Sequence, residues 1–435
     1  MKRKILIALG KGVLFILHLF DLLFTGSVTG RTKDEQTRDP YIGFKILRSR
    51  GGVLRSYASR GWMAVGFEEA QAIFLDSERF GSDIRKNKFL SRVIRAASGD
   101  RKVSLLDDPT MLSLDPPDHT RLRKLVNQGF LHKDIMALEP RIGAIVDECL
   151  DRYDPSTGQF DIITQLAKPL PAIVIAELLG LPKKDMAVFQ SLSEELLHLT
   201  AIGDDELMER GTLANEKLVE YLEEVIEQKR QSPGQDLIGR LIAAEEEGDR
   251  LTSEEMYSTC VLLLVAGHET TTRLIGTGIY TLLKHRDQFE MLKRDPGLVA
   301  NAIEEMLRYE PPVQLMPRFA KEDTVFYGKK IKKNQMIVPV IASANRDPAA
   351  NDNPDDFDIT RKDIRHVSFG YGIHLCLGLN LARLEARVAF NKLLARFPDM
   401  TLASDEVNWL GGSALVRGMD QLLINTNDSQ AQSAA

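Results

Sequence analysis

Apolar residues recur at three- and four-residue spacing through most of the chain between about residues 118 and 310. This spacing places them on one side of a helix, so it predicts that helices dominate this region. Stretches that look like strands are few and short, and they cover residues 63–65, 325–327, 336–340 and 421–425. The pattern therefore predicts a mainly α fold with a small β portion.

The first residues form a separate apolar segment, since residues 5–24 follow a basic MetLysArgLys start. Lys4, Lys11, His18 and Thr25 recur every seven residues, which gives a helix one narrow polar stripe opposite a wide apolar face. This favours a membrane-associated amphipathic helix over residues 1–30. A single membrane-spanning anchor, which would have to bury Lys11 and Asp21, ranks second, and a cleaved signal peptide ranks third.

The rest of the chain carries no linker rich in Pro, Gly or Ser between residues 34 and 423. We therefore expect one large domain over residues 31–426, followed by a disordered tail over residues 427–435. With 43% hydrophobic and 27% charged residues, the 435-residue chain is neither disordered as a whole nor a multi-span membrane protein.

Charge and cysteine content exclude further classes. The net charge of −6 argues against a general nucleic-acid binder. The three cysteines form no CxxC pair, which excludes a disulfide framework and a multi-cysteine zinc site and favours a reducing, cytoplasmic location, with membrane association through the first helix left open. Cys149 and Cys260 lie in helix-like apolar runs, where a thiol packs as a small hydrophobe, whereas Cys376 lies in a glycine-rich stretch.

The glycine-rich stretch runs from Phe369 to Gly378 and precedes a helix-like run over residues 380–394. Backbone N–H groups and the positive end of a helix dipole would stabilise a thiolate at Cys376, and the glycines let the backbone approach a flat ligand closely. Cys376 is therefore a candidate axial ligand for a haem iron.

This stretch resembles the haem-ligand signature FxxGxxxCxG of the cytochrome P450 family, which it matches without a departure. The resemblance implies the cytochrome P450 fold, a haem b cofactor and Cys376 as the proximal thiolate, which pushes electron density onto the iron and favours O–O cleavage. Phe369, Gly370 and Gly378 would contact the cofactor as parts of the same loop.

Glu305 and Arg308 lie at i, i+3 in a helix-like run over residues 298–309. Such a pair alone is commonly a solvated surface salt bridge. Followed by GluProProVal, it resembles the ExxR motif of the same family, and the stretch from Asn345 to Arg361 resembles the meander to which that motif is tied. The resemblance implies a structural role for Glu305 and Arg308.

The longest predicted helix opens with a capping-box pattern at Thr252 and continues to about Leu283, apolar nearly all round. Its internal polar cluster over residues 268–272 needs hydrogen-bond partners. HisGluThrThrThr does not complete the HExxH zinc motif, because Thr272 stands where the second His is required.

The stretch from Ala266 to Thr271 resembles the (A/G)GxxTT segment of cytochromes P450. The resemblance implies that Ala266 and Gly267 lie against the cofactor and that Glu269 and Thr270 relay protons to dioxygen. Alternatively, Thr270 simply donates to a carbonyl one turn earlier.

Haem propionates need cationic partners inside a protein. LeuAspProProAspHisThrArg predicts a helix capped by Asp115 with Pro116 at its first position, which places His119 and Arg123 on one face. The resemblance assigns four residues to the propionates: His119, Arg123, Arg318 and His374.

These features together predict a monooxygenase that inserts one oxygen atom of O2 into an apolar or acidic small organic substrate. A cluster of basic residues over residues 81–104, with Arg85, Lys88, Arg92 and Arg95, suggests an anchor for an acidic substrate, although a solvated loop or a membrane-facing patch is favoured. Apolar residues that include Leu415 are expected to line the substrate pocket.

No flavin or nucleotide motif is present in the chain, so electrons are expected from a separate ferredoxin or flavodoxin. Arg361, Lys362 and Arg365 form the predicted basic docking patch. Two alternatives remain: a peroxide-driven hydroxylase or decarboxylase on the same scaffold, and a haem-based sensor or ligand-binding protein without turnover.

Overall fold

The structure is a computed structural model that describes residues 38–57, 60–92, 107–200, 205–232, 234–246, 251–410 and 415–427. The helix predicted over residues 1–30 and nearly all of the predicted tail lie outside the described residues. Within the described ranges, none of the helices combines the length and the hydropathy that crossing a bilayer requires.

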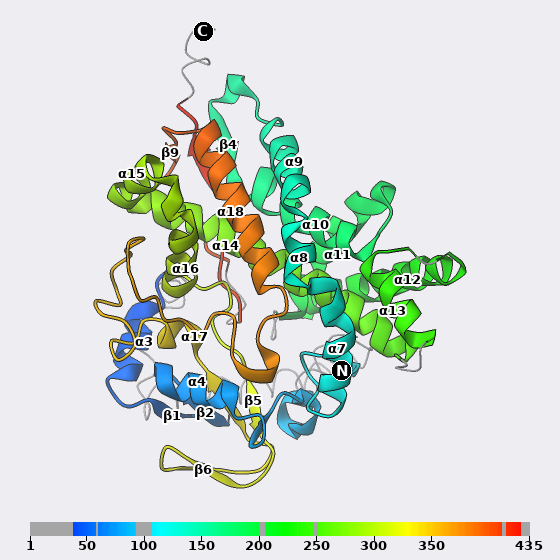
Figure 1. Ribbon diagram of the computed structural model, residues 1–435. Coiled ribbons are helices and arrows are strands. Elements are labelled where there is room, and N and C mark those ends of the chain that lie inside the picture. Colours follow the sequence, from blue (N-terminus) through cyan, green and yellow to red (C-terminus); the bar gives the residue numbers. More distant parts are fainter. Residues whose placement is uncertain are drawn as a thin grey trace.

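Helices make up most of the fold (Figure 1), as the apolar spacing predicted. The α-helices are α3 (Tyr41–Arg48), α4 (Phe67–Leu75), α7 (Asp118–Asn127), α8 (His132–Met136), α9 (Glu139–Leu150), α10 (Pro169–Leu179), α11 (Met186–Leu196), α12 (Asp205–Gln231), α13 (Leu237–Glu246), α14 (Ser253–Lys284), α15 (Arg286–Arg294), α16 (Val299–Tyr309), α17 (Ile341–Ala344) and α18 (Leu379–Arg396).

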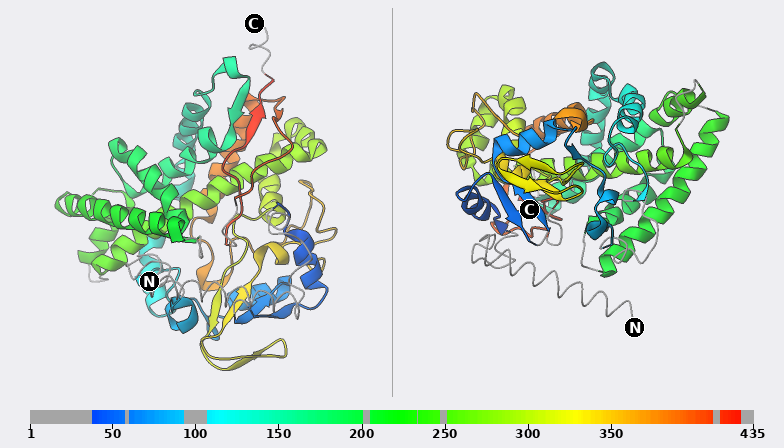
Figure 2. Two further views of the ribbon diagram at one scale, coloured as in Figure 1. Left: turned by 180° about the vertical axis from the view of Figure 1, so that it is seen from behind. Right: turned by 90° about the horizontal axis from the view of Figure 1, so that it is seen from below.

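The strands form small sheets, of which the largest lies at one end of the molecule beside α3 and α4 (Figures 1 and 2). It has the order β1-β2-β8-β5-β3, in which β2 and β8 run parallel and the other pairs antiparallel. A second sheet has the order β4-β10-β9, and β6 pairs with β7. The strands are β1 (Val53–Ser56), β2 (Gly61–Ala64), β3 (Phe80–Gly81), β4 (Gln159–Asp161), β5 (Arg318–Ala320), β6 (Thr324–Phe326), β7 (Lys329–Ile331), β8 (Met336–Pro339), β9 (Thr401–Leu402) and β10 (Leu423–Asn425).

The four predicted strands are confirmed as β2, β6, β8 and β10, each displaced by no more than a few residues. The sequence did not predict β1, β3, β4, β5, β7 and β9. Each of these has two to four residues. Such segments are too short to show alternation, and pairing with distant strands stabilises them.

Helix α14 runs through the main hydrophobic core and begins with the predicted capping box. Thr252 Oγ1 accepts a hydrogen bond from the Glu255 N–H (3.1 Å), and Glu255 Oε2 accepts one from the Thr252 N–H (3.0 Å). Thr272 Oγ1 donates to the carbonyls of His268 (3.0 Å) and Ala167 (2.9 Å). Threonine hydroxyls thus find backbone acceptors within and beside the buried helix.

Cys149 and Cys260 are fully buried in this core, as predicted. Burial raises the pKa of the Cys149 thiol to about 11 and that of Cys260 to about 12. Both thiols therefore stay protonated and act as small hydrophobes.

The predicted cap of the helix that carries His119 is wrong. Helix α7 begins at Asp118, and its N-cap residue is Pro117, without a side-chain cap. The Asp115 carboxylate instead accepts a hydrogen bond from the Ser82 N–H (2.9 Å) and lies 3.3 Å from Lys86 Nζ. The Asp115 carboxylate, which the local pattern assigned to the helix end, is thus bound by residues distant in the sequence.

Candidate haem-binding and oxygen-activating site

The cysteine loop places Cys376 two residues before Gly378, the N-cap of α18. The Cys376 N–H donates to the Phe369 carbonyl (2.8 Å), which closes the loop on itself. Gly370 and Gly372 have φ values of +66° and +68°, a region that L side chains rarely adopt. A Cβ at Gly372 would also lie 2.6 Å from the Phe74 carbonyl oxygen. The loop therefore requires glycine at position 372 for two independent reasons.

The Cys376 thiol lies deep in the protein but keeps accessible surface. Burial raises the pKa of Cys376, whereas a hydrogen bond from the Gly378 backbone and the charges of Arg123 and Arg383 lower it. A metal cation deprotonates a coordinating thiol outright. Unlike the buried Cys149 and Cys260, Cys376 is therefore accessible to a ligand, and a metal cation bound there would hold it as a thiolate.

Four basic side chains gather beside the cysteine loop, and they come from three parts of the chain. His119 and Arg123 project from α7, Arg318 begins β5, and His374 lies in the loop itself. The rings of His119 and His374 have centroids 4.3 Å apart, and Arg123 donates to the Leu375 carbonyl. The structure thus brings together all four residues that the family resemblance assigned to the propionates.

Burial and mutual repulsion dominate the electrostatics of this basic cluster, and the nearby Asp115 carboxylate offsets them only in part. Burial, followed by neighbouring cations that include Arg318, lowers the pKa of His119 to about 4 and that of His374 to about 3. Burial also lowers the pKa of Arg318 to about 10. Both ring nitrogens of His119 are buried without a hydrogen-bond partner in the described part of the chain.

A ligand that carries carboxylates would supply the missing charge and acceptors. Haem fits these residues, because its two propionates are such groups and Cys376 would provide a thiolate for its iron. Arg123 lowers the pKa of Cys376 and belongs to the basic cluster, so the two halves of the site adjoin.

Positions in the middle of α14 are open to solvent between two mostly buried stretches of the helix. Ala266 is exposed, and Gly267 and Thr270 are partly exposed. A Cβ at Gly267 would meet only the Ile175 side chain, at 3.6 Å or more. These residues therefore form an open face between the buried stretches of the helix, where a ligand has room to lie.

Glu269 and Thr270 are neighbours in the chain, but each is bonded to a different group. Thr270 Oγ1 donates to the Ala266 carbonyl (2.7 Å), the local bond that the sequence left open as an alternative. The Glu269 carboxylate accepts a hydrogen bond from Arg273 Nη2, and both side chains are buried. The sequence did not predict a role for Arg273, because Arg at i+4 looks like any helix salt bridge.

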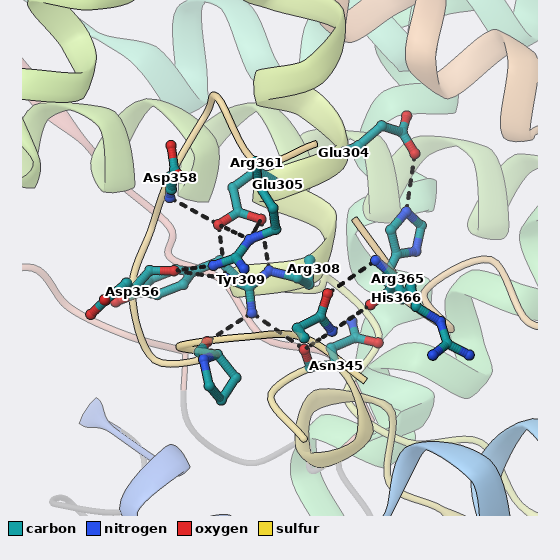
Figure 3. Close-up of polar contacts among 12 residues, drawn as sticks. Glu304, Glu305, Arg308, Tyr309, Asn345, Asp356, Asp358, Arg361, Arg365 and His366 are labelled. Atoms are coloured by element: carbon teal, nitrogen blue, oxygen red, sulfur yellow. Dashed lines mark hydrogen bonds and ion pairs between the residues drawn. The ribbon is translucent and has the colours of Figure 1, made fainter. Parts of the chain in front are cut away.

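Glu305 and Arg308 form a fully buried ion pair, in which Arg308 Nε and Nη2 donate to Glu305 at 2.7 Å and 2.8 Å (Figure 3). Arg308 also donates to the carbonyls of Pro354 (2.7 Å) and Asp356 (2.8 Å). Glu305 accepts a further bond from the Asp358 N–H (2.9 Å). The pair therefore joins α16 to the meander.

Arg361 belongs to this network and not to an exposed patch, which corrects one of the three residues of the predicted docking surface. Its Nε lies 3.3 Å from Glu305, its Nη1 donates to the Asp352 carbonyl (2.6 Å), and its side chain is only 10% exposed. Lys362 and Arg365 are exposed. A buried carboxylate recruits a second guanidinium here, which charge counting along the sequence cannot reveal.

Sequence reasoning also missed Arg383 and Glu304. Arg383 lies over the Phe369 ring, with its guanidinium carbon 4.6 Å from the ring centroid, and pairs with Glu304 at 2.6 Å. His366 Nε2 lies 3.0 Å from the same carboxylate. Phe369 is thus held from one side by a cation that also lowers the pKa of Cys376. The spacing of these residues in the sequence gives no signal for the contact.

The described part of the basic segment offers little to an acidic substrate. Arg85 donates to both carboxylate oxygens of Asp83 (2.8 Å and 3.2 Å). Lys88 lines a surface hollow together with Phe89 and residues 332–335, and Arg92 is exposed. Arg95 lies outside the described residues.

The chain is similar to known proteins over most of its length. The family model described as Cytochrome P450 matches residues 84–296 and 297–408. The chain is 39% identical over 402 residues to the polyketide biosynthesis cytochrome P450 PksS of Bacillus subtilis, covering 92% of this chain and 95% of the relative. It is 38% identical over 402 residues to the vitamin D(3) 25-hydroxylase of Pseudonocardia autotrophica, with 91% and 95% covered.

Among solved structures, CYP109E1 from Bacillus megaterium in complex with testosterone superposes with a TM-score of 0.82 at 35% identity, covering 91% of this chain and all of that one. The fold predicted from the sequence is thereby confirmed. With the cysteine loop, the buried ExxR pair and these likenesses in agreement over nearly the whole chain, this protein belongs to the cytochrome P450 family and is a haem-dependent monooxygenase.

Proposed function

We propose that Cys376 is the proximal thiolate of a haem b whose propionates are bound by His119, Arg123, Arg318 and His374. The observation that carries this proposal is the cluster of four basic groups beside the cysteine loop, of which His119 and Arg318 are buried, with both nitrogens of His119 lacking partners in the described chain. Phe369, Gly370 and Gly378 would support the thiolate side of the haem, and Ala266 and Gly267 the opposite side.

When bound, the haem supplies the activation of dioxygen and the oxidation of the substrate, and the thiolate assists by donating electron density. The protein supplies substrate placement, exclusion of water and protons. Thr270, whose hydroxyl lies at the open face of α14, is proposed to relay protons from Glu269 toward dioxygen. One oxygen atom enters the substrate and the other leaves as water, so each turnover consumes two protons.

The substrate is proposed to be an apolar organic molecule without an essential carboxylate. Arg85, the first basic residue of the segment suggested as an anion anchor, already pairs with Asp83. Val313, Leu315 and Met316 are only partly buried and lie beside the C-terminal segment, where the Gln314 N–H donates to the Leu415 carbonyl (2.8 Å). The names of the relatives, which include a vitamin D(3) hydroxylase and a testosterone complex, agree with a bulky apolar substrate.

A spin-state titration tests this substrate class. We expect bulky neutral compounds such as steroids to shift the haem spectrum at lower concentration than fatty acids of matched carbon number. If fatty acids bind more tightly and Lys88→Ala removes that preference, the substrate is acidic and the proposal is wrong.

The electron donor is proposed to be an acidic ferredoxin or flavodoxin that docks near the exposed Lys362 and Arg365. Neutralising both residues should slow reduction and weaken its dependence on ionic strength. Lys332→Ala, which removes an exposed cation paired with Asp323 elsewhere on the surface, is the matched control. Reduction rates that respond equally to both changes would contradict docking at this surface.

The experiment that tests the haem assignment is the spectrum of the reduced protein with bound CO. Thiolate ligation gives a strongly red-shifted Soret band, so the wild type should show it and Cys376→Ala should not. Cys149→Ala, which removes a buried core thiol, is the control that should keep the band. An unshifted band in the wild type would exclude thiolate ligation, and loss of haem from Arg318→Ala and His119→Ala would support the propionate assignment.

A further inference from the structure

An ion pair within α14 includes Glu269, the residue proposed to provide protons. Glu269 and Arg273 stand at i, i+4, with the acid on the N-terminal side, which is the favourable orientation. Each side chain is only 7% exposed, and Arg273 Nη2 donates to Glu269. Arg273 Nε is buried without a hydrogen-bond partner in the described residues. The free energy needed to remove two charges from water can exceed the attraction between them inside the protein. A buried ion pair is therefore weakly explained by a contribution to stability alone.

Arg273 reaches its place only because the C-terminal segment has a glycine there. A Cβ at Gly418 would lie 2.1 Å from Arg273 Cδ and 2.7 Å from its Nη1. The same segment pairs with residues that follow α16, since the Arg417 N–H donates to the Pro312 carbonyl (2.9 Å) and Val416 forms a bridge with Val313. The Arg273 side chain is therefore confined between its own helix and the C-terminal segment, which keeps it beside Glu269.

The charged and titratable groups around the pair come from three elements. On α14 itself, burial lowers the pKa of His268 to about 4, so this residue is neutral near pH 7. Lys168 at the start of α10 lies close enough to affect His268. Asp420 on the C-terminal segment favours the charged form of Arg273, although burial lowers the pKa of Arg273 to about 10. Arg273 therefore stays a cation near pH 7.

We propose that Arg273 is a positioning residue that holds Glu269 as a carboxylate away from Thr270, so that Glu269 delivers a proton only after it leaves Arg273. Successive residues on a helix point about 100° apart, and Thr270 is bonded to Ala266 in this state. The inference rests on the proposed function, which assigns protons to Glu269 and Thr270.

The proton transfer balances without a further reactant. Glu269 takes up one proton from hydronium or a buffer acid in bulk solvent and gives it to Thr270 Oγ1, while the Thr270 hydroxyl releases its own proton on the open side of α14, so that one proton moves in all. Glu269 then returns to Arg273 as a carboxylate, and no electrons move in these steps.

The first test reads the resting protein by infrared difference spectroscopy and needs no turnover. Arg273→Gln leaves Glu269 buried without a cation, so Glu269 should take up a proton and show the carbonyl band of a carboxylic acid. The wild type and Arg273→Lys should lack this band, and the double variant E269Q/R273Q should lose it. If Arg273→Gln shows no band that E269Q removes, Arg273 does not hold Glu269 ionised.

The second test is the pH dependence of coupling, measured as product formed per electron pair consumed. Loss of a cation next to an acid raises the pKa of the acid by about 1–3 units. The pH above which coupling falls should therefore rise by about 1–3 units in Arg273→Gln and stay near the wild-type value in Arg273→Lys. An unshifted profile in Arg273→Gln, in the presence of its infrared band, would show that Glu269 is held but does not supply the proton.

Two further variants keep the inference testable. Gly418→Ala should displace the Arg273 side chain without removing it, and it replaces Arg273→Gln if that variant does not fold. It should show the same carboxylic-acid band and the same shift in the pH dependence of coupling. Arg286→Gln breaks an i, i+4 pair with Glu290 whose side chains are both 41% exposed, and it should change neither readout. The red-shifted CO band should persist in every variant. Its absence from the wild type would refute the haem-thiolate proposal, whereas its presence with unchanged infrared spectra would refute only the role of Arg273.

Discussion

Replacement of Glu305 by Ala tests how strongly the buried ExxR network stabilises the protein. Glu305 accepts hydrogen bonds from Arg308 Nε and Nη2, from the Asp358 N–H and from Arg361. Its loss leaves the fully buried Arg308 guanidinium with backbone carbonyls as its only hydrogen-bond partners among the described residues. Removing one partner of a buried ion pair costs about 3–5 kcal/mol, because the other charge stays buried.

This loss is large against a total folding free energy of about 5–15 kcal/mol. With an m-value of about 3 kcal/mol per M in urea, the unfolding midpoint should fall by about 1–2 M. The matched control is Lys332→Ala, which breaks an ion pair of similar length (2.8 Å) whose side chains are 73% and 60% exposed. Such exposed pairs contribute about 0–1 kcal/mol, so the control midpoint should shift by about 0.3 M or less.

The effect should reach the cysteine loop through Asn345. Arg308 donates to the Asn345 carbonyl (3.3 Å), and the Asn345 side chain accepts from the Val367 N–H (2.8 Å) and donates to Ser368 (2.8 Å), just before Phe369. Haem content after purification should therefore fall with stability in Glu305→Ala. Urea unfolding that matches Lys332→Ala, with full haem content, would refute the reasoning.

Three further substitutions give independent tests by thermal or urea unfolding. Burial holds the pKa of His268 at about 4, against 6.5 in the unfolded chain, so between these pH values acid protonates only the unfolded state and lowers the free energy of unfolding. His268→Gln should remove up to about 3 kcal/mol of this loss of stability on acidification. Identical pH profiles of wild type and variant would contradict this. Burial raises the pKa of Glu385 well above its usual value, so the protein loses stability as the pH rises above about 4.5. Glu385→Gln should therefore be more stable than the wild type at pH 7 but not at pH 4. An equal gain in stability at both pH values would contradict this. Gly372→Ala should cost clearly more than Gly328→Ala, because both have positive φ but only the first Cβ meets backbone, at 2.6 Å from the Phe74 oxygen; equal losses would show that space is not limiting.

Local signals in the sequence predicted most of the fold. The capping box at Thr252 fixes where α14 begins, and helical spacing predicts its length, because both depend on residues within a few turns of each other. Short strands such as β3 and β9 escaped prediction because two residues carry no pattern, and their stability comes from β5 and β10.

The site divides in the same way, according to how far apart the interacting residues lie in the sequence. Cys376 and its glycines form one contiguous motif, so the loop is recognisable from the order of its residues alone. Arg361 was expected on the surface because it lies close in the sequence to Lys362 and Arg365, yet the carboxylate that binds it comes from α16.

Arg273 presents the opposite case, since its partner Glu269 lies one turn away and the pairing could be expected from spacing alone. What the sequence could not reveal is that this pair is buried and that Gly418 makes room for it. Exposed, the same pair would contribute a few tenths of a kcal/mol and have no effect on chemistry. Because the pair is buried and Glu269 precedes Thr270 in the chain, the role that we propose for it in proton delivery depends on its burial and not on its spacing.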